Sequence, residues 1–238
     1  MRNDRRRPAR PRPGKPAQKK GAPPKPAQKK PAAQKPQPAP PEEPRTLRLG
    51  LVPGTTPGRW IDTWKQRMPH VELDLVPISF ADQRERLDQL DLALVRLPLE
   101  RTQDLHVIPL YDEVPVVVAS ADSFLMATDR LTADDLVDQV LITPGDDVLG
   151  PLDLPTVAPD FPRIATTEGA IETVASGVGI LVVPMSLARL HHRKDADYRP
   201  LLGGRTSTVA LAWPIDATSP DVEAFVGIVR GRTANSSR

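Results

Sequence analysis

Short, almost wholly apolar segments alternate along the chain with segments of helical periodicity, and this alternation most constrains the fold. Residues 91–96 read DLALVR, a run typical of a strand whose sheet is covered on both faces. Earlier strands are indicated over 46–52, where three leucines alternate with other residues, and over 71–78. Helical segments separate these strands, and a β-α-β-α-β order predicts a mostly parallel sheet flanked by helices.

The first helix is predicted directly after the turn PGTTPG at 53–58. Thr56 is suited to be its N-cap and Pro57 to be its first helical residue. Its buried stripe, which extends through Met68, is expected to comprise Ile61, Trp64 and Met68. A second, short helix is expected over 81–89.

The later part of the chain continues the alternation. Further strands are predicted at 106–110, 114–119, 140–143, 163–166, 179–184 and 208–213. Thr132 is predicted to cap a short helix over 131–136, and Thr167 a helix that runs to about 176. The last helix is expected to have Ser219 as its N-cap and Pro220 at its first position.

Residues 1–45 differ from everything that follows. They contain thirteen prolines, and their 14 Lys and Arg against 3 Asp and Glu give a net charge of +11, which leaves −9 for the remainder. Proline fixes φ and lacks an N–H, so helices and strands do not persist in such a segment. Low hydrophobicity with high charge leaves nothing to offset the entropy of ordering. We predict a disordered basic tail rich in Pro, Lys and Ala.

Two interpretations of this tail stay open: a solubilising linker, or a segment that attracts nucleic acid without sequence preference. No aromatic residue is interleaved, so base stacking and sequence readout are not expected. Nothing apolar anchors the tail to a membrane surface, and no membrane partner is predicted. In the nucleic-acid interpretation the phosphate contacts come from Arg5, Arg6, Arg7, Lys19, Lys20, Lys29 and Lys30.

Composition excludes several classes of protein. The chain has no cysteine, so disulfides, thiolate zinc sites and cysteine nucleophiles are excluded. No apolar signal-peptide core follows the basic start, and the longest apolar run, 178–185, is far shorter than the roughly 20 residues that span a bilayer. These features predict a soluble, cytoplasmic protein.

Catalytic signatures are missing as well. The sequence has no G-x-S-x-G, P-loop or H-E-x-x-H pattern. SGVG at 176–179 is predicted to end a helix and is not a dinucleotide fingerprint. His191 and His192 are adjacent and cannot line one helix face as metal ligands. We expect no catalytic residues, no metal and no cofactor, and therefore a protein that is not an enzyme.

Six stretches, in this order, resemble the effector-binding domain of LysR-type transcriptional regulators over about 46–230. They are LRLGLV (47–52), RERLDQLDLALVRLP (84–98), PLYDEVPVVVAS (109–120), RLTADDLVDQVLI (130–142), ETVASGVGILVVP (172–184) and VALAWP with PDVEAFVGIVR (209–230). The family's N-terminal winged helix-turn-helix has no counterpart, because residues 1–45 are too short and too rich in proline for it.

The resemblance implies an α/β fold of the type 2 periplasmic-binding-protein kind. Two Rossmann-like subdomains, about 46–116 with 207–232 and about 118–205, would be joined by two crossover strands near 115–120 and 200–208. Together they would form one effector-binding domain over 46–232. Residues 233–238 are expected to be a disordered C-terminus.

A ligand cleft between the subdomains is also implied, with small effectors that are often carboxylates. Helix N-termini offer free N–H groups and positive potential for such an anion, and Arg96 at the end of its strand can grip a carboxylate with two nitrogens. Glu168 would weaken anion binding there. The predicted effector-binding residues are Gly54, Thr55, Thr56, Arg96, Thr143, Thr166 and Thr167. The alternatives are plain helix caps or strand ends for the threonines, and a surface ion pair with Glu100 or Asp104 for Arg96.

The favoured function is a small-molecule sensor that resembles a LysR-type effector domain without its own DNA-reading module. Ligand binding would shift the equilibrium between open and closed clefts. Homodimers, or heterodimers with a full-length regulator, are expected partners. A nucleic-acid-associated protein that acts through its tail, a transport-type solute-binding protein and an enzyme are the alternatives.

DNA retention across a salt series separates the two interpretations of the tail. If the seven basic side chains neutralise phosphates, the full chain binds DNA at low salt and loses roughly 10³-fold or more in affinity between about 50 and 200 mM salt. A 46–238 truncation should not be retained. Retention of neither form would make the tail a linker, and equal retention of both would place the DNA affinity in the body.

Overall fold

The computed structural model describes residues 44–231, so almost all of the predicted tail and the predicted C-terminus 233–238 lie outside the described residues. The strands are β1 (Arg45–Leu51), β2 (Val71–Pro77), β3 (Leu92–Leu97), β4 (Leu105–Glu113), β5 (Pro115–Ser120), β6 (Leu181–Pro184), β7 (Ala196–Pro200) and β8 (Ser207–Pro214). The α-helices are α1 (Gly58–Arg67), α2 (Gln83–Leu87), α3 (Thr167–Ala175), α4 (Met185–Leu190) and α5 (Pro220–Val229), and η1 (Phe124–Ala127) and η2 (Ala133–Leu136) are 3₁₀ helices.

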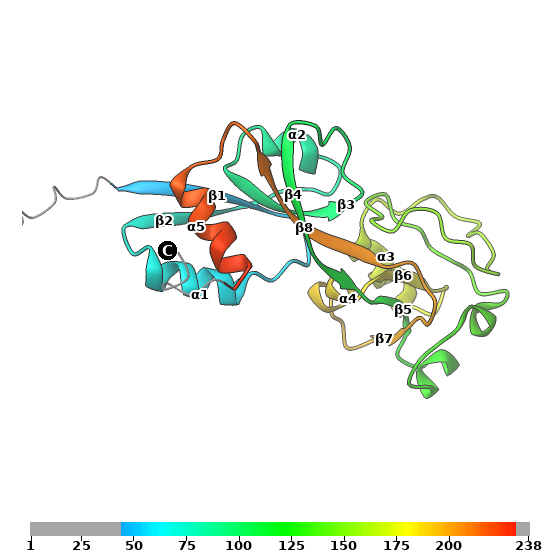
Figure 1. Cartoon of the computed structure of the whole chain (residues 1–238). Helices are drawn as coiled ribbons and strands as arrows, with labels where there is room; N and C mark the ends of the chain where they lie inside the picture. Colours follow the sequence, from blue (N-terminus) through cyan, green and yellow to red (C-terminus); the bar gives the residue numbers. More distant parts are fainter. Residues whose placement is uncertain (1–43, 232–238) are drawn as a thin grey trace, which may run out of the picture. The chain divides into compact units, whose positions relative to one another are not determined.

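These elements form two lobes (Figure 1). Lobe I, built from 44–113 and 207–231, has a five-stranded sheet in the order β2-β1-β3-β8-β4. Lobe II, built from 115–200, has a three-stranded sheet in the order β6-β5-β7. The α/β fold with two lobes joined by two crossovers confirms the predicted fold class.

The prediction of a mostly parallel sheet is wrong beyond the first three strands. β1 pairs in parallel with β2 and β3, as the β-α-β-α-β order requires. β8 pairs antiparallel with β3 and β4, and both strand pairs of lobe II are antiparallel. The lobe I sheet is therefore mixed and the lobe II sheet is antiparallel, because strands that return from the other lobe run against their neighbours.

Helices cover both faces of the lobe I sheet, and β3 shows the consequence. Leu92 and Leu94 pack in a cluster with α1 and α5, while Ala93 and Val95 pack in another with α2. All four side chains are fully buried. The apolar run that the sequence presents at this strand therefore has the physical cause that was predicted for it.

The sheet of lobe II is covered on both faces in the same way. Val116 and Val118 of β5 pack against α3 and α4, whereas Val117 and Ala119 face the side of η1 and η2. The N-cap of η2 is Thr132, as predicted, and it also forms a capping box with Asp135. These hydrogen bonds from Thr132 hold the pKa of the Asp135 carboxyl below its usual value.

The chain crosses between the lobes twice. β4 passes into β5 through Val114, and the chain returns between the end of β7 and the start of β8. The two crossings run side by side, since Glu113 pairs with Ser207 in one sheet and Val116 with Pro200 in the other (Figure 1). Both positions lie near the predicted subdomain bounds.

Several local predictions need correction. Residues 140–143 contribute only isolated bridges, from Val140 to Val157 and from Leu141 to Ile180, and 163–166 form no strand. The strand β7 was not anticipated, because its sequence ADYRP is polar and only partly buried. The predicted cap of α5 is confirmed, since the Ser219 side chain accepts a hydrogen bond from the N–H of Val222.

No helix among residues 44–231 is both long and apolar enough to cross a bilayer.

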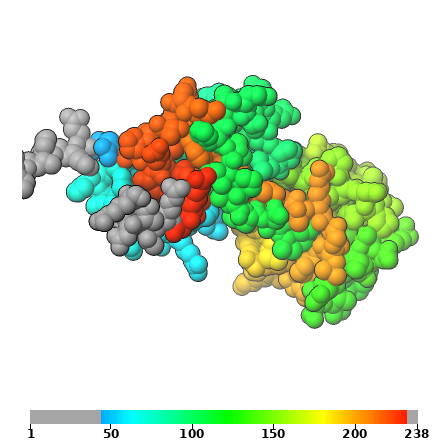
Figure 2. Space-filling view, viewed as in Figure 1, coloured from blue at the N-terminus to red at the C-terminus, as the bar shows by residue number. Residues whose placement is uncertain are grey.

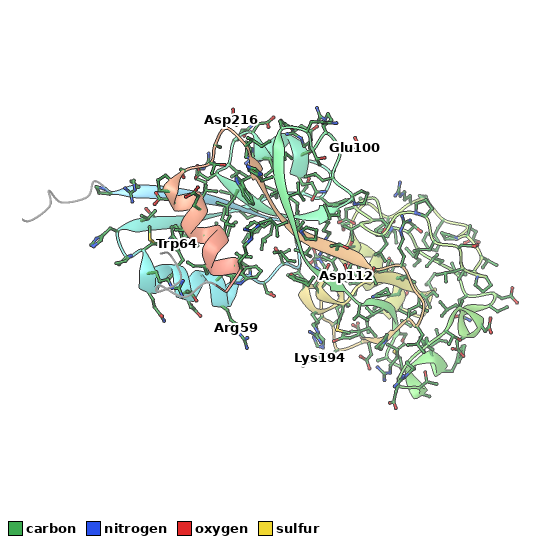
Figure 3. All side chains as sticks on the ribbon, in the orientation of Figure 1. Arg59, Trp64, Glu100, Asp112, Lys194 and Asp216 are labelled. Atoms are coloured by element: carbon green, nitrogen blue, oxygen red, sulfur yellow. The ribbon has the colours of Figure 1, made fainter. Side chains whose placement is uncertain are left out.

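The core of lobe I depends on an aromatic pair between α1 and α5. Trp64 and Phe225 are fully buried, with ring centroids 5.7 Å apart, and the indole Nε1 of Trp64 donates to the Val71 carbonyl at 3.0 Å (Figure 3). This pair packs between both helices and the sheet. Truncating Phe225 would therefore leave a cavity that the surrounding helices and strands cannot readily fill.

Phe225→Ala should lower the free energy of unfolding by about 3–5 kcal/mol, measured by urea denaturation, because it leaves a cavity in a close-packed core. Phe124→Ala is the matched control. Phe124 is 68% exposed, so the same truncation there should change stability by less than about 0.5 kcal/mol. Similar losses for the two variants would contradict the described packing.

Candidate functional site

Arg96 lies near the end of β3 and is the only fully buried charged side chain among residues 44–231, with an exposed fraction of 0%. The side chain of Gln83, the first residue of α2, holds its backbone. Gln83 Nε2 donates to the Arg96 carbonyl at 2.9 Å, and Gln83 Oε1 accepts from the Arg96 N–H at 2.8 Å. This clamp extends the hydrogen bonding of the sheet and fixes where the guanidinium can reach.

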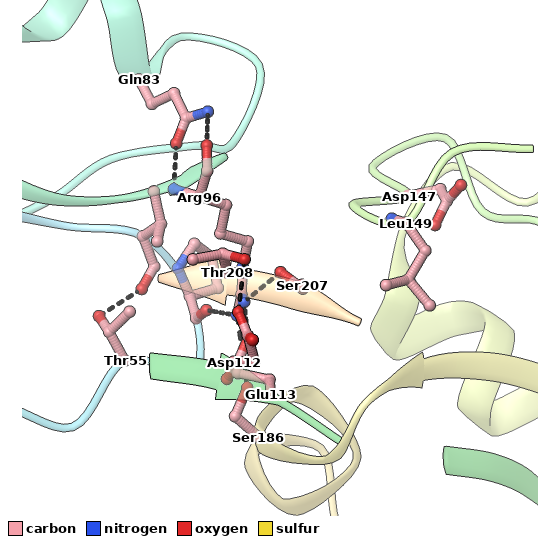
Figure 4. A network of polar contacts seen from close by, with 12 residues as sticks. Thr55, Gln83, Arg96, Asp112, Glu113, Asp147, Leu149, Ser186, Ser207 and Thr208 are labelled. Atoms are coloured by element: carbon pink, nitrogen blue, oxygen red, sulfur yellow. Dashed lines mark hydrogen bonds and ion pairs between the residues drawn. The ribbon is translucent and has the colours of Figure 1, made fainter. Parts of the chain in front are cut away.

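The guanidinium of Arg96 joins both crossings and both lobes (Figure 4). It forms an ion pair with Glu113 at the end of β4, and Nη1 donates to Ser207 Oγ at 3.1 Å at the start of β8. Nη2 donates to the Pro53 carbonyl at 2.9 Å and to Ser186 Oγ of lobe II at 3.3 Å. Both terminal nitrogens are therefore engaged, and only Nε lacks a hydrogen-bond partner in the described part of the chain.

Burial lowers the pKa of Arg96 to about 10, which still leaves the group protonated at neutral pH. The Glu113 carboxylate beside it favours this charged form. Burial also raises the pKa of the nearby Tyr111 phenol, and the positive charge of Arg96 opposes that rise. The region where Arg96 links the two lobes, which we call the junction, thus holds a permanent positive charge. The carboxylate that compensates it, Glu113, belongs to lobe I, as Arg96 does.

Gly54 allows the two lobes to approach at this point. Its φ is +84°, and a Cβ there would lie 2.7 Å from Ser186 Oγ and 3.2 Å from Arg96 Nη2. A larger residue at this position would be strained and would also push Ser186 away. The contact between Gly54 and Ser186, bridged by Arg96, separates two cavities.

The first, which we call the cleft cavity, has a volume of about 300 Å³ and lies between the lobes. Lobe I contributes Pro53, Ser79, Phe80 and Arg96. The apolar side chains from lobe II are Val148, Leu187 and Leu190. The polar ones are Asp146, Thr166, Thr167, Glu168 and His191.

A close backbone approach in lobe II positions the polar wall of the cleft cavity. Gly145 donates to the Ile164 carbonyl at 2.8 Å, and a Cβ on Gly145 would lie 2.5 Å from the Ala165 oxygen. Asp146 is thereby placed beside the start of α3, where its Oδ1 accepts a hydrogen bond from Thr167 Oγ1 at 2.8 Å. The Asp146 carboxylate and the N-terminus of α3 form one continuous surface.

The second cavity has a volume of about 590 Å³ and lies on the other side of the Gly54–Ser186 contact. Residues from the start of α1, the end of β4 and α4 line it, including Arg59, Trp60, Tyr111, Asp112, Met185 and Arg189. In the space-filling view it corresponds to the hollow between α1, in cyan, and α4, in yellow (Figure 2). Arg59 projects outward from α1 on this side (Figure 3).

Comparison with known protein families gives one match, which covers residues 41–234: the LysR substrate binding domain. The chain belongs to this family. The resemblance predicted from the sequence is thus confirmed, and the two lobes with the cleft cavity between them are those of a LysR substrate binding domain. No curated protein matches the chain closely enough to add a relative.

Solved structures agree on the fold. A mutant OxyR regulatory domain from Pseudomonas aeruginosa is 24% identical, with a TM-score of 0.59 over 78% of this chain and 94% of that one. The BenM effector binding domain with its effector benzoate is 21% identical, with a TM-score of 0.65 over 79% and 92%. A full-length OxyR from the same Pseudomonas species is 22% identical with a TM-score of 0.60, and the alignment spans 79% of this chain but 66% of that one.

Within this LysR substrate binding domain, the predicted effector residues divide into three groups. Arg96, Thr166 and Thr167 meet at the cleft cavity. Gly54 and Thr56 line the second cavity. Thr55 donates its hydroxyl to the Val52 carbonyl at 2.7 Å, and Thr143 is exposed; neither lines either cavity.

Three local assignments at these residues are corrected. α1 begins at Gly58 with Pro57 as its N-cap, so Thr56 is not the cap and Pro57 is not the first helical residue. Thr166, whose side chain accepts from the Gly169 N–H, caps α3 in place of Thr167. The alternative that Arg96 forms a surface ion pair with Glu100 or Asp104 is wrong, since its ionic partner is the buried Glu113.

Sequence reasoning missed the residues that fix Arg96, namely Gln83, Glu113, Ser186 and Ser207. It also did not predict that Asp146 and His191 line the cleft cavity. A charged residue inside the apolar run DLALVR does signal a buried ion pair. The hydrogen-bond partners of Arg96 could not be identified, because Ser186 and Ser207 lie 90 and 111 residues away in sequence and meet it only in the folded chain.

Arg96→Met should lower the free energy of unfolding by about 3–5 kcal/mol, because it leaves the Glu113 carboxylate buried without its cation. The double variant Arg96→Met/Glu113→Leu should recover part of that loss. Urea denaturation of the single and double variants measures the coupling.

Arg101→Met provides the control for this cycle. The ion pair between Arg101 and Glu85 is exposed on both sides, 63% and 64%, so its removal should cost no more than about 1 kcal/mol. Equal losses at Arg96 and Arg101 would show that the buried pair does not hold the junction.

Proposed function

We propose that this chain is a ligand-sensing regulatory protein that binds a small-molecule effector in the cleft cavity. One observation carries the proposal: in a chain of the LysR substrate binding domain family, both lobes line a cavity of about 300 Å³ where Arg96, Thr166 and Thr167 meet. That volume is at the lower end of the range for small-molecule sites. The effector is therefore compact.

The effector acts by changing the equilibrium between lobe arrangements. A ligand that contacts both Phe80 of lobe I and Leu187 of lobe II binds the closed arrangement better than an open one. It shifts the population by the ratio of those two affinities. The direct side-chain link across the lobes at Arg96 is the hydrogen bond to Ser186, so the lobes can move at modest cost.

The proposal assigns no catalytic step to the chain and places its action in the cytoplasm. Pairing with a second copy or with a full-length regulator stays a prediction, as does contact of residues 1–45 with nucleic acid. The phosphate-contacting residues predicted in that segment, from Arg5 to Lys30, lie outside the described residues.

A thermal-shift screen of small molecules, followed by one blocking variant, tests the proposal. A true effector at about 100 times its Kd should stabilise the fold by about 2.7 kcal/mol. Leu190→Trp adds bulk to the wall of the cleft cavity from a side chain that is 54% exposed, so the fold should tolerate it and the ligand-induced shift should vanish.

Leu202→Trp is the matched control, since Leu202 is 48% exposed and does not line the cleft cavity. Its ligand-induced shift should equal that of the unaltered chain. A ligand whose stabilisation survives Leu190→Trp unchanged binds elsewhere, and that result would refute the cleft cavity as the effector site.

A further inference from the structure

The charges that line the cleft cavity do not suit a carboxylate ligand. Three lining side chains carry formal charge at neutral pH: Arg96, Asp146 and Glu168. Arg96 is compensated by Glu113. Among residues 44–231, no ion pair neutralises Asp146 or Glu168. The cavity is therefore acidic overall.

Arg96 cannot grip a ligand carboxylate in the described arrangement. Both of its terminal nitrogens already have protein acceptors, and its side chain is 0% exposed. An anion that approached it would have to displace Ser186 or Pro53 and would lie close to the Glu113 carboxylate. Such a displacement leaves buried polar groups without partners, which opposes binding.

The N-terminus of α3 does not supply the missing positive charge. Glu168 is in its first turn and complements the helix dipole, and the Thr166 hydroxyl accepts from the Gly169 N–H. Asp146 lies beside it through its hydrogen bond with Thr167. A helix end bordered by two carboxylates attracts cations more than anions.

Besides the polar side chains of Ser79 and His191, the remaining wall of the cleft cavity is apolar. Phe80 comes from lobe I and Val148, Leu187 and Leu190 from lobe II. A ring of Phe80 offers its face to a cation as well as to an apolar group. The cavity therefore combines an acidic end with a compact apolar body.

We infer that the effector of this cavity is a small organic cation, an amine, amidine or guanidine with a compact apolar group. Its positive end binds Asp146 and Glu168, and its apolar part lies against Phe80, Leu187 and Leu190. This inference rests on the proposed function and specifies its ligand class. It departs from the carboxylate effectors that the sequence resemblance implied.

Benzamidine and benzoate test the inference, because they share a ring and a planar head group of similar size but carry opposite charges. Each is titrated into the ¹⁵N-labelled full chain while amide shifts are recorded at Gly145, Thr167 and Gly169. Benzamidine should shift these amides in a saturable manner. Benzoate should bind there at least about tenfold more weakly.

Variants then connect the effect to the two carboxylates. Asp146→Asn/Glu168→Gln keeps the shape and an acceptor for Thr167 but removes both charges, and it should weaken benzamidine binding by at least about tenfold. Glu172→Gln is the matched control: it removes one carboxylate from the same helix, one turn further on and outside the cavity wall. Benzamidine affinity should be unchanged in that variant.

Each other outcome contradicts a specific step. Benzoate binding at these amides as tightly as benzamidine would overturn the ligand class and leave the proposed function standing. An unchanged benzamidine affinity in the double variant would overturn the role of Asp146 and Glu168. No shift with either probe near its solubility limit would overturn both the ligand class and the cleft cavity as a binding site.

Discussion

The ion pair between Arg96 and Glu113 is the constraint on which the rest of the junction depends. Burying a guanidinium costs far more free energy than one hydrogen bond returns, so the chain must surround it with acceptors. Those acceptors come from the loop after β1, the end of β4 and the start of β8. Three segments far apart in sequence are therefore held to one point, and the two crossings leave lobe I from that point.

This arrangement leaves the link between the lobes weaker than the links within lobe I. The carboxylate that neutralises Arg96 belongs to β4, whereas lobe II contributes the Ser186 hydroxyl, at 3.3 Å. Opening the lobes would break that hydrogen bond without separating the two charges. The ion pair between Arg96 and Glu113 therefore does not itself hold the two lobes together, because both charges belong to lobe I.

The sequence predicted most accurately what depends on local pattern. The burial of Trp64 in α1, the N-cap Thr132 and the apolar run of β3 all follow from spacing and side-chain type. It failed where pairing is long-range. The antiparallel position of β8 and the polar strand β7 depend on neighbours far along the chain, and so do the partners of Arg96. Arg96 is predicted as a ligand contact because it leaves the carboxyl end of its strand, and the structure adds that its guanidinium pairs with Glu113 and hydrogen-bonds to Ser186.

The pairing of Arg96 with Glu113 is also the reason why we infer a ligand class other than the one that the resemblance implied. Unmatched positive charge favours a carboxylate ligand, and here the one arginine in the cleft wall is matched by Glu113. Gly145 then brings Asp146 against the N-terminus of α3, where Glu168 adds a second carboxylate. Acidic side chains complement the positive end of a helix dipole, so these two carboxylates reduce the attraction of this helix end for a further anion. The inferred preference for a cation therefore rests on three side chains, Glu113, Asp146 and Glu168, within a fold that the family shares.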